Sequence, residues 1–139
     1  MASTSASIAL PGDMNVPPAK RQFSIAIAYS RAPLPMTRAD QMTMAHLIAF
    51  LAARGHEVDL YALDSAEPMT ADQRAWLDAH CRQVRLFPHG LGRRLVGVAL
   101  GLIKGLPLQV GWFLNGAQRR AVRAGMEQVD LGYCYYIRS

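Results

Sequence analysis

The residues best suited to chemistry in this chain of 139 residues are its histidines and cysteines, and they are scattered. The four histidines are His46, His56, His80 and His89. None of them accompanies a serine or cysteine nucleophile in a recognisable motif such as G-x-S-x-G. Cys81 and Cys134 are the two cysteines, and no Cys or His pair has the spacing of a structural zinc site. The sequence therefore supports neither hydrolase chemistry nor a metal site.

Sequence motifs that bind phosphate are also absent. The first apolar run, FSIAIAY, is followed by SRAPLPMTRAD rather than by G-x-G-x-x-G, and G-x-x-x-x-G-K-[ST] does not occur. An NAD-binding domain and a P-loop NTPase are both disfavoured. Asp64 follows the second apolar run and could contact a ribose, but an ordinary turn residue is the favoured interpretation.

Charge is distributed unevenly along a chain whose net charge is +5. Residues 40–78 carry seven acids and two bases, whereas residues 82–123 carry eight basic residues and no acid. Clustered arginine favours phosphates or anionic lipid, and the alternative is a solvated basic surface. Nucleic acid is not an expected partner, because no basic motif interleaved with aromatic residues accompanies the charge.

Alternating strands and helices must position these residues. Apolar runs predict strands over 23–29, 58–63, 81–87 and 130–137. Helices are predicted from a Thr37 cap to Gly55, from Thr70 or Asp72 to residue 79, over 91–106, and over 118–128 after an Asn115 cap. This order predicts an α/β fold: a Rossmann-like, doubly wound parallel sheet with helices on both faces.

Ligands of such a sheet bind at the carboxyl ends of its strands. The candidate site must then come from residues 29–40, 64–68, 88–94 and 136–139. Among the residues of these segments, His89 lies in a loop at the expected ligand edge and could contact a ligand. For His89 a solvent-exposed loop position without a ligand is the favoured alternative.

The segment 91–106 is apolar around most of a helix and carries Arg93 and Arg94 near its start. A core helix with a solvated arginine pair is the first interpretation. The second is an interfacial helix whose arginines meet the head groups of an anionic membrane. Trp112 and Phe113, nearby, suit either interpretation. The stretch 95–110 is too short and too polar to span a bilayer.

Residues 1–21 contain three prolines and no basic segment before an apolar run, so we expect a disordered tail rather than a signal peptide. Two cysteines suit a reducing, cytoplasmic location. The sequence ends directly after its last predicted strand, so the domain of residues 22–139 looks incomplete. We expect an uncovered sheet edge to favour self-association.

Several segments, taken in order, resemble a known family. They are FSIAIAYSRAPLP, AFLAARGHEVDLYALDS, CRQVRLFPHG, GLPLQVGWFLNGAQRRAVRA and VDLGYCYYIRS. Together they resemble the N-terminal, acceptor-side domain of a GT-B fold family-4 glycosyltransferase, closest to the sugar transferases associated with exopolysaccharide and exosortase systems. The segment from Gly105 to Phe113 with its following basic helix is the most diagnostic match, and the resemblance covers residues 22–139.

The resemblance implies transfer of a sugar from a nucleotide-sugar donor to a glycan or lipid-linked acceptor, with no further cofactor. It implies that Ser30, Arg31, Thr37 and Arg38 line the cleft between two domains, with Arg138 near the fourth strand. The C-terminal donor domain has no counterpart here, so we expect the chain alone to be inactive. No catalytic residue can be assigned, because tyrosines stand where relatives often carry a histidine.

The alternative hypothesis is a truncated, non-catalytic remnant. It would act as a basic membrane-surface or protein-interaction module, with Arg93 and Arg94 at the contact.

Overall fold

The computed structural model describes Pro11, Pro17 and residues 21–64, 68–108, 111 and 115–135. Most of the expected tail lies outside these ranges, as do Arg138, Trp112 and Phe113. The carbonyl of Pro11 accepts a hydrogen bond of 3.3 Å from the indole nitrogen of Trp76.

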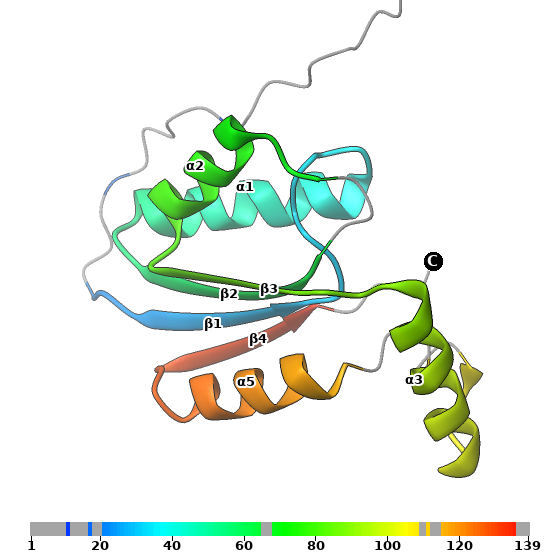
Figure 1. Ribbon diagram of the computed structural model, residues 1–139. Coiled ribbons are helices and arrows are strands. Elements are labelled where there is room, and N and C mark those ends of the chain that lie inside the picture. Colours follow the sequence, from blue (N-terminus) through cyan, green and yellow to red (C-terminus); the bar gives the residue numbers. More distant parts are fainter. Residues whose placement is uncertain are drawn as a thin grey trace, which may run out of the picture.

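Four parallel strands form one sheet in the order β3-β2-β1-β4 (Figure 1). Their bounds are β1 Ser24–Tyr29, β2 Glu57–Leu63, β3 Gln83–Phe87 and β4 Leu131–Tyr135. In the register of the sheet, Ile27 of β1 is aligned with Leu60 of β2 and with Tyr133 of β4. Parallel strands require crossover connections, and the helices supply them.

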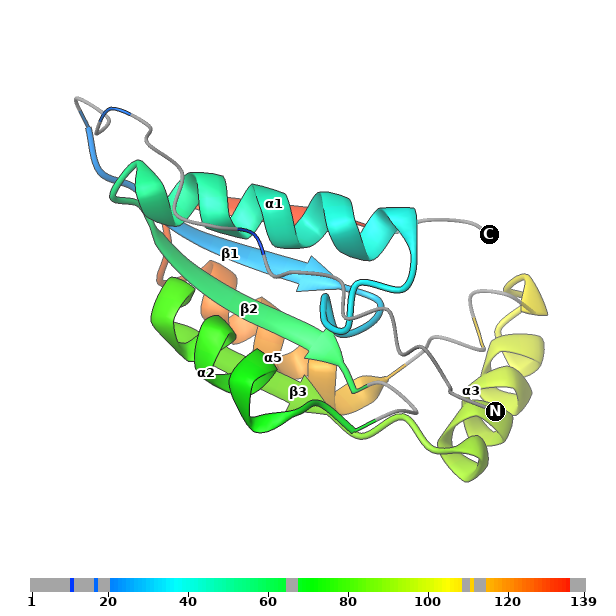
Figure 2. The ribbon, with the colours of Figure 1, turned by 90° about the horizontal axis from the view of Figure 1, so that it is seen from above.

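Helices cover both faces of the sheet, as the sequence predicts. α1 (Ala39–Ala53) and α2 (Ala71–His80) lie on one face, and α5 (Gly116–Met126) lies on the other (Figures 1 and 2). Residues 25–29 and 58–63 are buried throughout because the central strands are covered on both sides. The structure thus confirms a Rossmann-like α/β domain.

The core is divided between the two faces. The larger cluster packs the sheet against α1 and α2 and includes Ile27, Leu60, Met44, Ile48 and Leu77. The smaller cluster faces α5: Ala26, Tyr61, Leu63 and Phe87, with Val122 and Met126 packed against them. Gly125 allows α5 to lie directly on Tyr61, because a Cβ at this position would be 3.1 Å from the ring atom Cε2.

Predicted helix ends are confirmed at three places. Thr70 and Gln73 form a capping box at α2, and Asn115 accepts hydrogen bonds from the first turn of α5. Gly55 ends α1 with a φ of 82°, which glycine adopts without strain.

The predicted Thr37 cap of α1 is wrong. Arg38 occupies the cap position, and no side chain caps the first turn. The Thr37 hydroxyl instead donates to Gln41 Oε1 at 2.9 Å. The third strand also begins later than predicted, at Gln83, because the backbone of Cys81 still bonds to Leu77 and completes α2.

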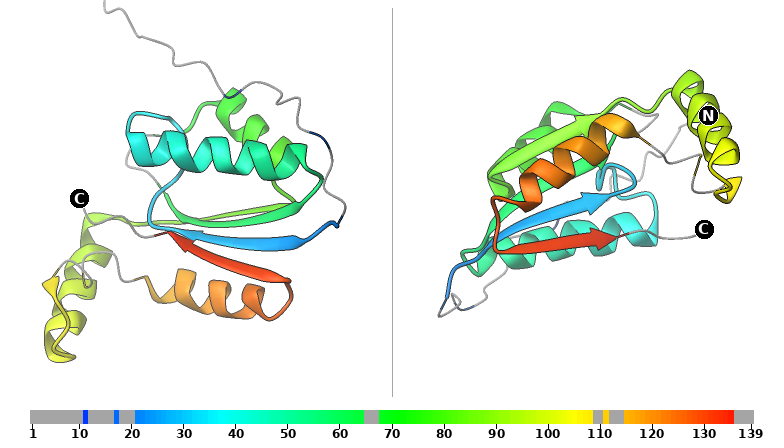
Figure 3. Two further views of the ribbon diagram at one scale, coloured as in Figure 1. Left: turned by 180° about the vertical axis from the view of Figure 1, so that it is seen from behind. Right: turned by 90° about the horizontal axis from the view of Figure 1, so that it is seen from below.

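α3 (Leu91–Ile103) differs most from the sequence prediction. It packs on neither face of the sheet and lies beyond the carboxyl ends of the strands (Figures 1 and 3), so its interpretation as a core helix is wrong. It ends before residue 106 because Gly105, with a φ of 66°, reverses the chain. None of the helices in the described ranges combines the length and apolar character needed to cross a membrane.

Candidate functional site

The carboxyl ends of the four strands meet at one edge of the sheet, here called the carboxyl edge. Between β1 and β4 the strand order reverses, since β2 and β3 extend the sheet on one side of β1 and β4 on the other. Such a switch point is where open α/β sheets bind ligands. Ser30, Arg31, Thr37 and Arg38 belong to the loop that leaves β1 at this point.

The loop of residues 30–38 is held in place by one buried side chain. Gln41 donates from Nε2 to the carbonyl of Ala32 at 2.9 Å, and its Oε1 accepts from Thr37. Ala32 and Leu34 are fully buried, and Ser30 is 7% exposed. Because apolar burial and these hydrogen bonds both fix the loop, its exposed residues have defined positions before any ligand binds.

Three ionisable groups at the start of this loop interact with one another. The Tyr29 hydroxyl donates to Asp40 Oδ2 at 2.8 Å, and the Arg31 guanidinium lies 3.4 Å from the same oxygen. Burial and the hydrogen bond to Asp40 raise the pKa of Tyr29 above its usual range. Tyr29 therefore remains a proton donor at neutral pH, and the group holds the loop rather than acting as a base.

Arg38, unlike Arg31, is exposed to solvent. No residue in the described ranges forms an ion pair or hydrogen bond with its side chain. It also precedes α1, whose first turn has no side-chain cap. Since a helix N-terminus carries partial positive charge, Arg38 and the start of α1 together suit a phosphate or another anion.

α5 fixes the other side of the carboxyl edge. Gln118, 6% exposed, donates from Nε2 to the carbonyls of Tyr29 at 2.9 Å and Tyr61 at 3.1 Å. Asn115 donates to the carbonyl of Pro88 at 3.2 Å and so holds the loop after β3. His89 in that loop is only 9% exposed, which corrects the solvent-exposed position favoured for it.

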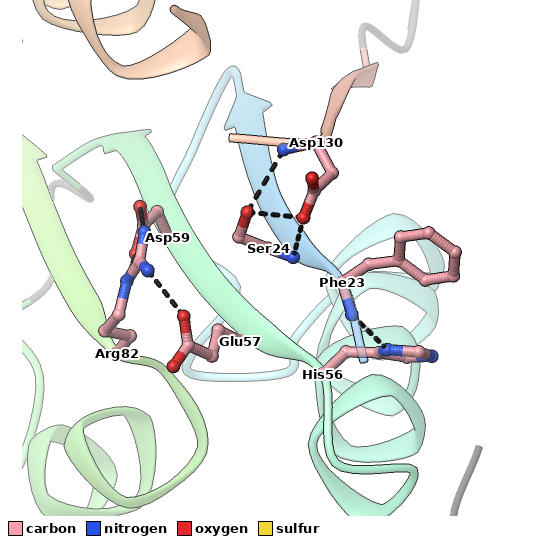
Figure 4. Close-up of polar contacts among 7 residues, drawn as sticks. All are labelled: Phe23, Ser24, His56, Glu57, Asp59, Arg82 and Asp130. Atoms are coloured by element: carbon pink, nitrogen blue, oxygen red, sulfur yellow. Dashed lines mark hydrogen bonds and ion pairs between the residues drawn. The ribbon is translucent and has the colours of Figure 1, made fainter. Parts of the chain in front are cut away.

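The predicted cationic block of residues 82–123 is not one surface. Arg82 lies at the opposite, amino edge of the sheet, where its guanidinium binds the carboxylates of Asp59 and Glu57 (Figure 4). These carboxylates raise the pKa of Arg82, so the guanidinium stays protonated, and their negative charges offset its positive charge. Arg119 and Arg120 are on α5, whereas Arg93 and Arg94 are in the first turn of α3.

The amino edge is closed by further hydrogen bonds. The Asp130 carboxylate accepts from the backbone nitrogen and the hydroxyl of Ser24, both at 2.8 Å, and His56 Nδ1 accepts from the backbone of Phe23 (Figure 4). These contacts supply hydrogen-bond partners to backbone groups where β1 begins. The part of the chain that the structure describes groups no three His, Cys, Asp or Glu side chains around a common metal position.

Two glutamines at the carboxyl edge were missed by sequence reasoning. Gln41 precedes the buried Met44 and Ile48 at helical spacing, and Gln118 precedes Val122 in the same way. A polar residue on the apolar face of a helix must find hydrogen-bond partners in the interior. That signal was present in the sequence, although the partners themselves were not readable from it.

Comparison with protein-family models, curated proteins and solved structures finds no match to this chain.

Proposed function

We propose that this chain is the acceptor-side domain of a glycosyltransferase that transfers a sugar from a nucleotide-sugar donor to a glycan or lipid-linked acceptor. The proposal rests on the segment resemblance and on one structural observation. That observation is the exposed Arg38 beside the uncapped start of α1, on a loop held rigidly at the switch point of the sheet.

The charge arrangement at this loop suits an anionic ligand. Asp40 is the nearby acid, and Tyr29 and Arg31 both bind its carboxylate. Its charge is thereby compensated inside the loop, while that of Arg38 remains directed to solvent. A phosphate of an acceptor or donor would meet the Arg38 cation and the amides of the first turn of α1, where the carboxylate of Asp40 is already bound by Tyr29 and Arg31.

These residues bind and orient, and the proposal assigns no general base to them. In this scheme a second domain supplies the donor contacts, as the resemblance implies. The chain alone would therefore show binding of an acceptor without transfer.

The test is a titration of the isotope-labelled chain followed by NMR chemical shifts. The probes are short oligosaccharides, a short-chain polyprenyl phosphate and a uridine diphosphate sugar. We expect shifts at residues 30–41 and at Gln118, and we expect Arg38→Ala to weaken binding of the phosphate-bearing probe by about tenfold or more.

Arg74→Ala is the matched control, because Arg74 is an exposed arginine on α2, outside the loop of residues 30–38, that pairs with Asp78 at 3.3 Å. It should leave the titration unchanged. Shifts confined to the amino edge, or no binding of any probe, would contradict the proposal and favour the non-catalytic alternative. The activity itself is tested by measuring sugar transfer with the protein purified from its native host and with its Arg38→Ala variant produced in the same host.

A further inference from the structure

α3 and the chain segment that follows it form a projecting unit, here called the α3 hairpin, made of residues 91–108 and Gly111. The chain reverses after α3, where the backbone of Leu106 donates to the carbonyl of Gly101 at 2.8 Å. The hairpin lies beyond the carboxyl edge and away from both helical layers (Figures 1 and 3).

Glycines allow the two arms of the hairpin to touch. A Cβ on Gly111 would lie 2.8 Å from Val98 Cα and 2.9 Å from the Gly97 carbonyl oxygen. A Cβ on Gly101 would lie 3.1 Å from Gly111 Cα. Gly97 and Gly101 are the buried residues of α3, and together with the half-buried Val98 they form the side of the helix that packs against the returning chain. The large side chains of α3 lie on the opposite side of the helix.

Those large side chains are exposed. The apolar ones on α3 are Leu91, Leu95, Val96, Leu100, Leu102 and Ile103. At about 100° per residue they occupy about half of the helix circumference, opposite the glycine face. Ile103 is 82% exposed and Leu102 60%, and Leu108 continues the apolar surface beyond the helix at 59%. Exposed apolar patches of this kind mark contact surfaces.

The charges beside this apolar surface indicate which kind of partner it fits. Arg93 and Lys104 are both exposed, and eleven residues, about three helical turns, separate them. They therefore lie along the same border of the apolar half. No acidic residue occurs between Asp78 and Glu127. An apolar face bordered by cations fits a surface that is apolar inside and anionic at its boundary.

We propose that the α3 hairpin seats the protein on an anionic lipid bilayer, with α3 lying in the plane of the interface. Its apolar half enters the acyl region, and Arg93 and Lys104 contact lipid phosphates. The inference does not depend on sugar transfer. If the proposed function also holds, the carboxyl edge would face the membrane, where lipid-linked acceptors are found.

The test is co-sedimentation with vesicles of phosphatidylcholine, alone or with about one third phosphatidylglycerol. We expect binding to the anionic vesicles, and a partition coefficient at least about tenfold lower for Leu95→Gln/Ile103→Gln. The matched control is Met42→Gln/Leu131→Gln, which changes exposed apolar side chains on α1 and β4 and should bind like the unmodified chain.

A second pair of variants separates a local contact from attraction by net charge. Arg93→Gln/Lys104→Gln and Arg119→Gln/Arg120→Gln remove the same charge, from the α3 hairpin and from α5. We expect only the first pair to lose the preference for anionic vesicles. Equal losses in both pairs would mean that total charge drives binding, and the proposal would be wrong.

Insertion of the apolar half of α3 into the bilayer is measured separately. The fluorescence of an environment-sensitive dye on Ile103→Cys, in a Cys134→Ser background, should shift to the blue with anionic vesicles, whereas that of the dye on Leu131→Cys should not.

Absence of vesicle binding overturns the proposal. If light scattering then shows a dimer that Leu95→Gln/Ile103→Gln dissociates, a second copy covers the hairpin instead. Arg38→Ala should leave vesicle binding intact, so the two proposals fail separately.

Discussion

The side-chain amide of Gln118 donates a hydrogen bond of 2.9 Å to the backbone carbonyl of Tyr29, 89 residues earlier in the chain. A second bond from the same nitrogen reaches Tyr61, the residue aligned with Ala28 in the sheet register. One side chain on α5 therefore joins the last residue of β1 to β2. The loop that carries Arg38 begins directly after that residue of β1.

Gln118→Ala should lower the free energy of unfolding by about 1–3 kcal/mol, because two buried carbonyls lose their donor. Urea denaturation followed by circular dichroism measures the change. Gln128→Ala, at an exposed position just after α5, should change it by less than about 0.5 kcal/mol. Equal effects of the two substitutions would show that the buried amide is not important for stability.

Arg82→Ala should destabilise the protein by about 2 kcal/mol, because Asp59, which is nearly buried, would keep its charge without a partner. The half-exposed position of Arg82 limits the loss. Adding Asp59→Asn should recover part of the stability in the double variant. Arg74→Ala, which breaks an exposed pair with Asp78, should cost less than about 0.5 kcal/mol.

The two cysteines should differ in reactivity. Burial raises the pKa of the Cys81 thiol to about 12, with nearby Asp59 and Asp78 adding to the shift, whereas Cys134 is exposed. At pH 8, iodoacetamide should modify Cys134 quickly and Cys81 only after denaturation. Peptide mass spectrometry over time measures both sites. Rapid labelling of the Cys134→Ser variant would contradict the buried position of Cys81.

Asp130 should make stability depend on acidity. The backbone nitrogen and hydroxyl of Ser24 lower the pKa of this carboxyl in the folded state. Its contribution is therefore complete above the unfolded pKa of about 3.9 and is lost as the pH falls through the lower, folded value. Asp130→Asn should be less stable than the unmodified chain at pH 7, and the difference should shrink below about pH 4.

Ser24→Ala removes the hydroxyl donor and should reduce that pH dependence while leaving the backbone donor in place. Denaturant midpoints measured from pH 2.5 to 7 give both comparisons. An Asp130→Asn difference that stays constant over this range would show that the carboxylate does not interact with Ser24.

Gly111→Ala should loosen the α3 hairpin without unfolding the sheet. The added methyl would meet backbone atoms of Gly97 and Val98, which cannot rotate away. Hydrogen exchange should therefore quicken in residues 97–106 and remain unchanged in β1 and β2. Gly116→Ala is the control, because a Cβ at that position meets nothing within 4 Å.

The sequence by itself determined the order of strands and helices and the doubly wound class. Apolar runs, the caps at Thr70 and Asn115 and the glycine at position 55 act within a few residues of one another, so their pattern is readable without a fold. The same local reasoning placed Ser30, Arg31, Thr37 and Arg38 at one edge, because parallel strands bring their carboxyl ends together.

Only the tertiary structure decided the place of α3 and the pairing of the charges. A helix that is apolar around most of its circumference suits a core helix as well as an interfacial one, and only its position beyond the sheet (Figure 1) decided between them. Likewise, Arg82 belongs by sequence to a cationic block, yet it binds carboxylates on the neighbouring strand. These outcomes depend on contacts between residues distant in sequence, and a local pattern contains no information about them.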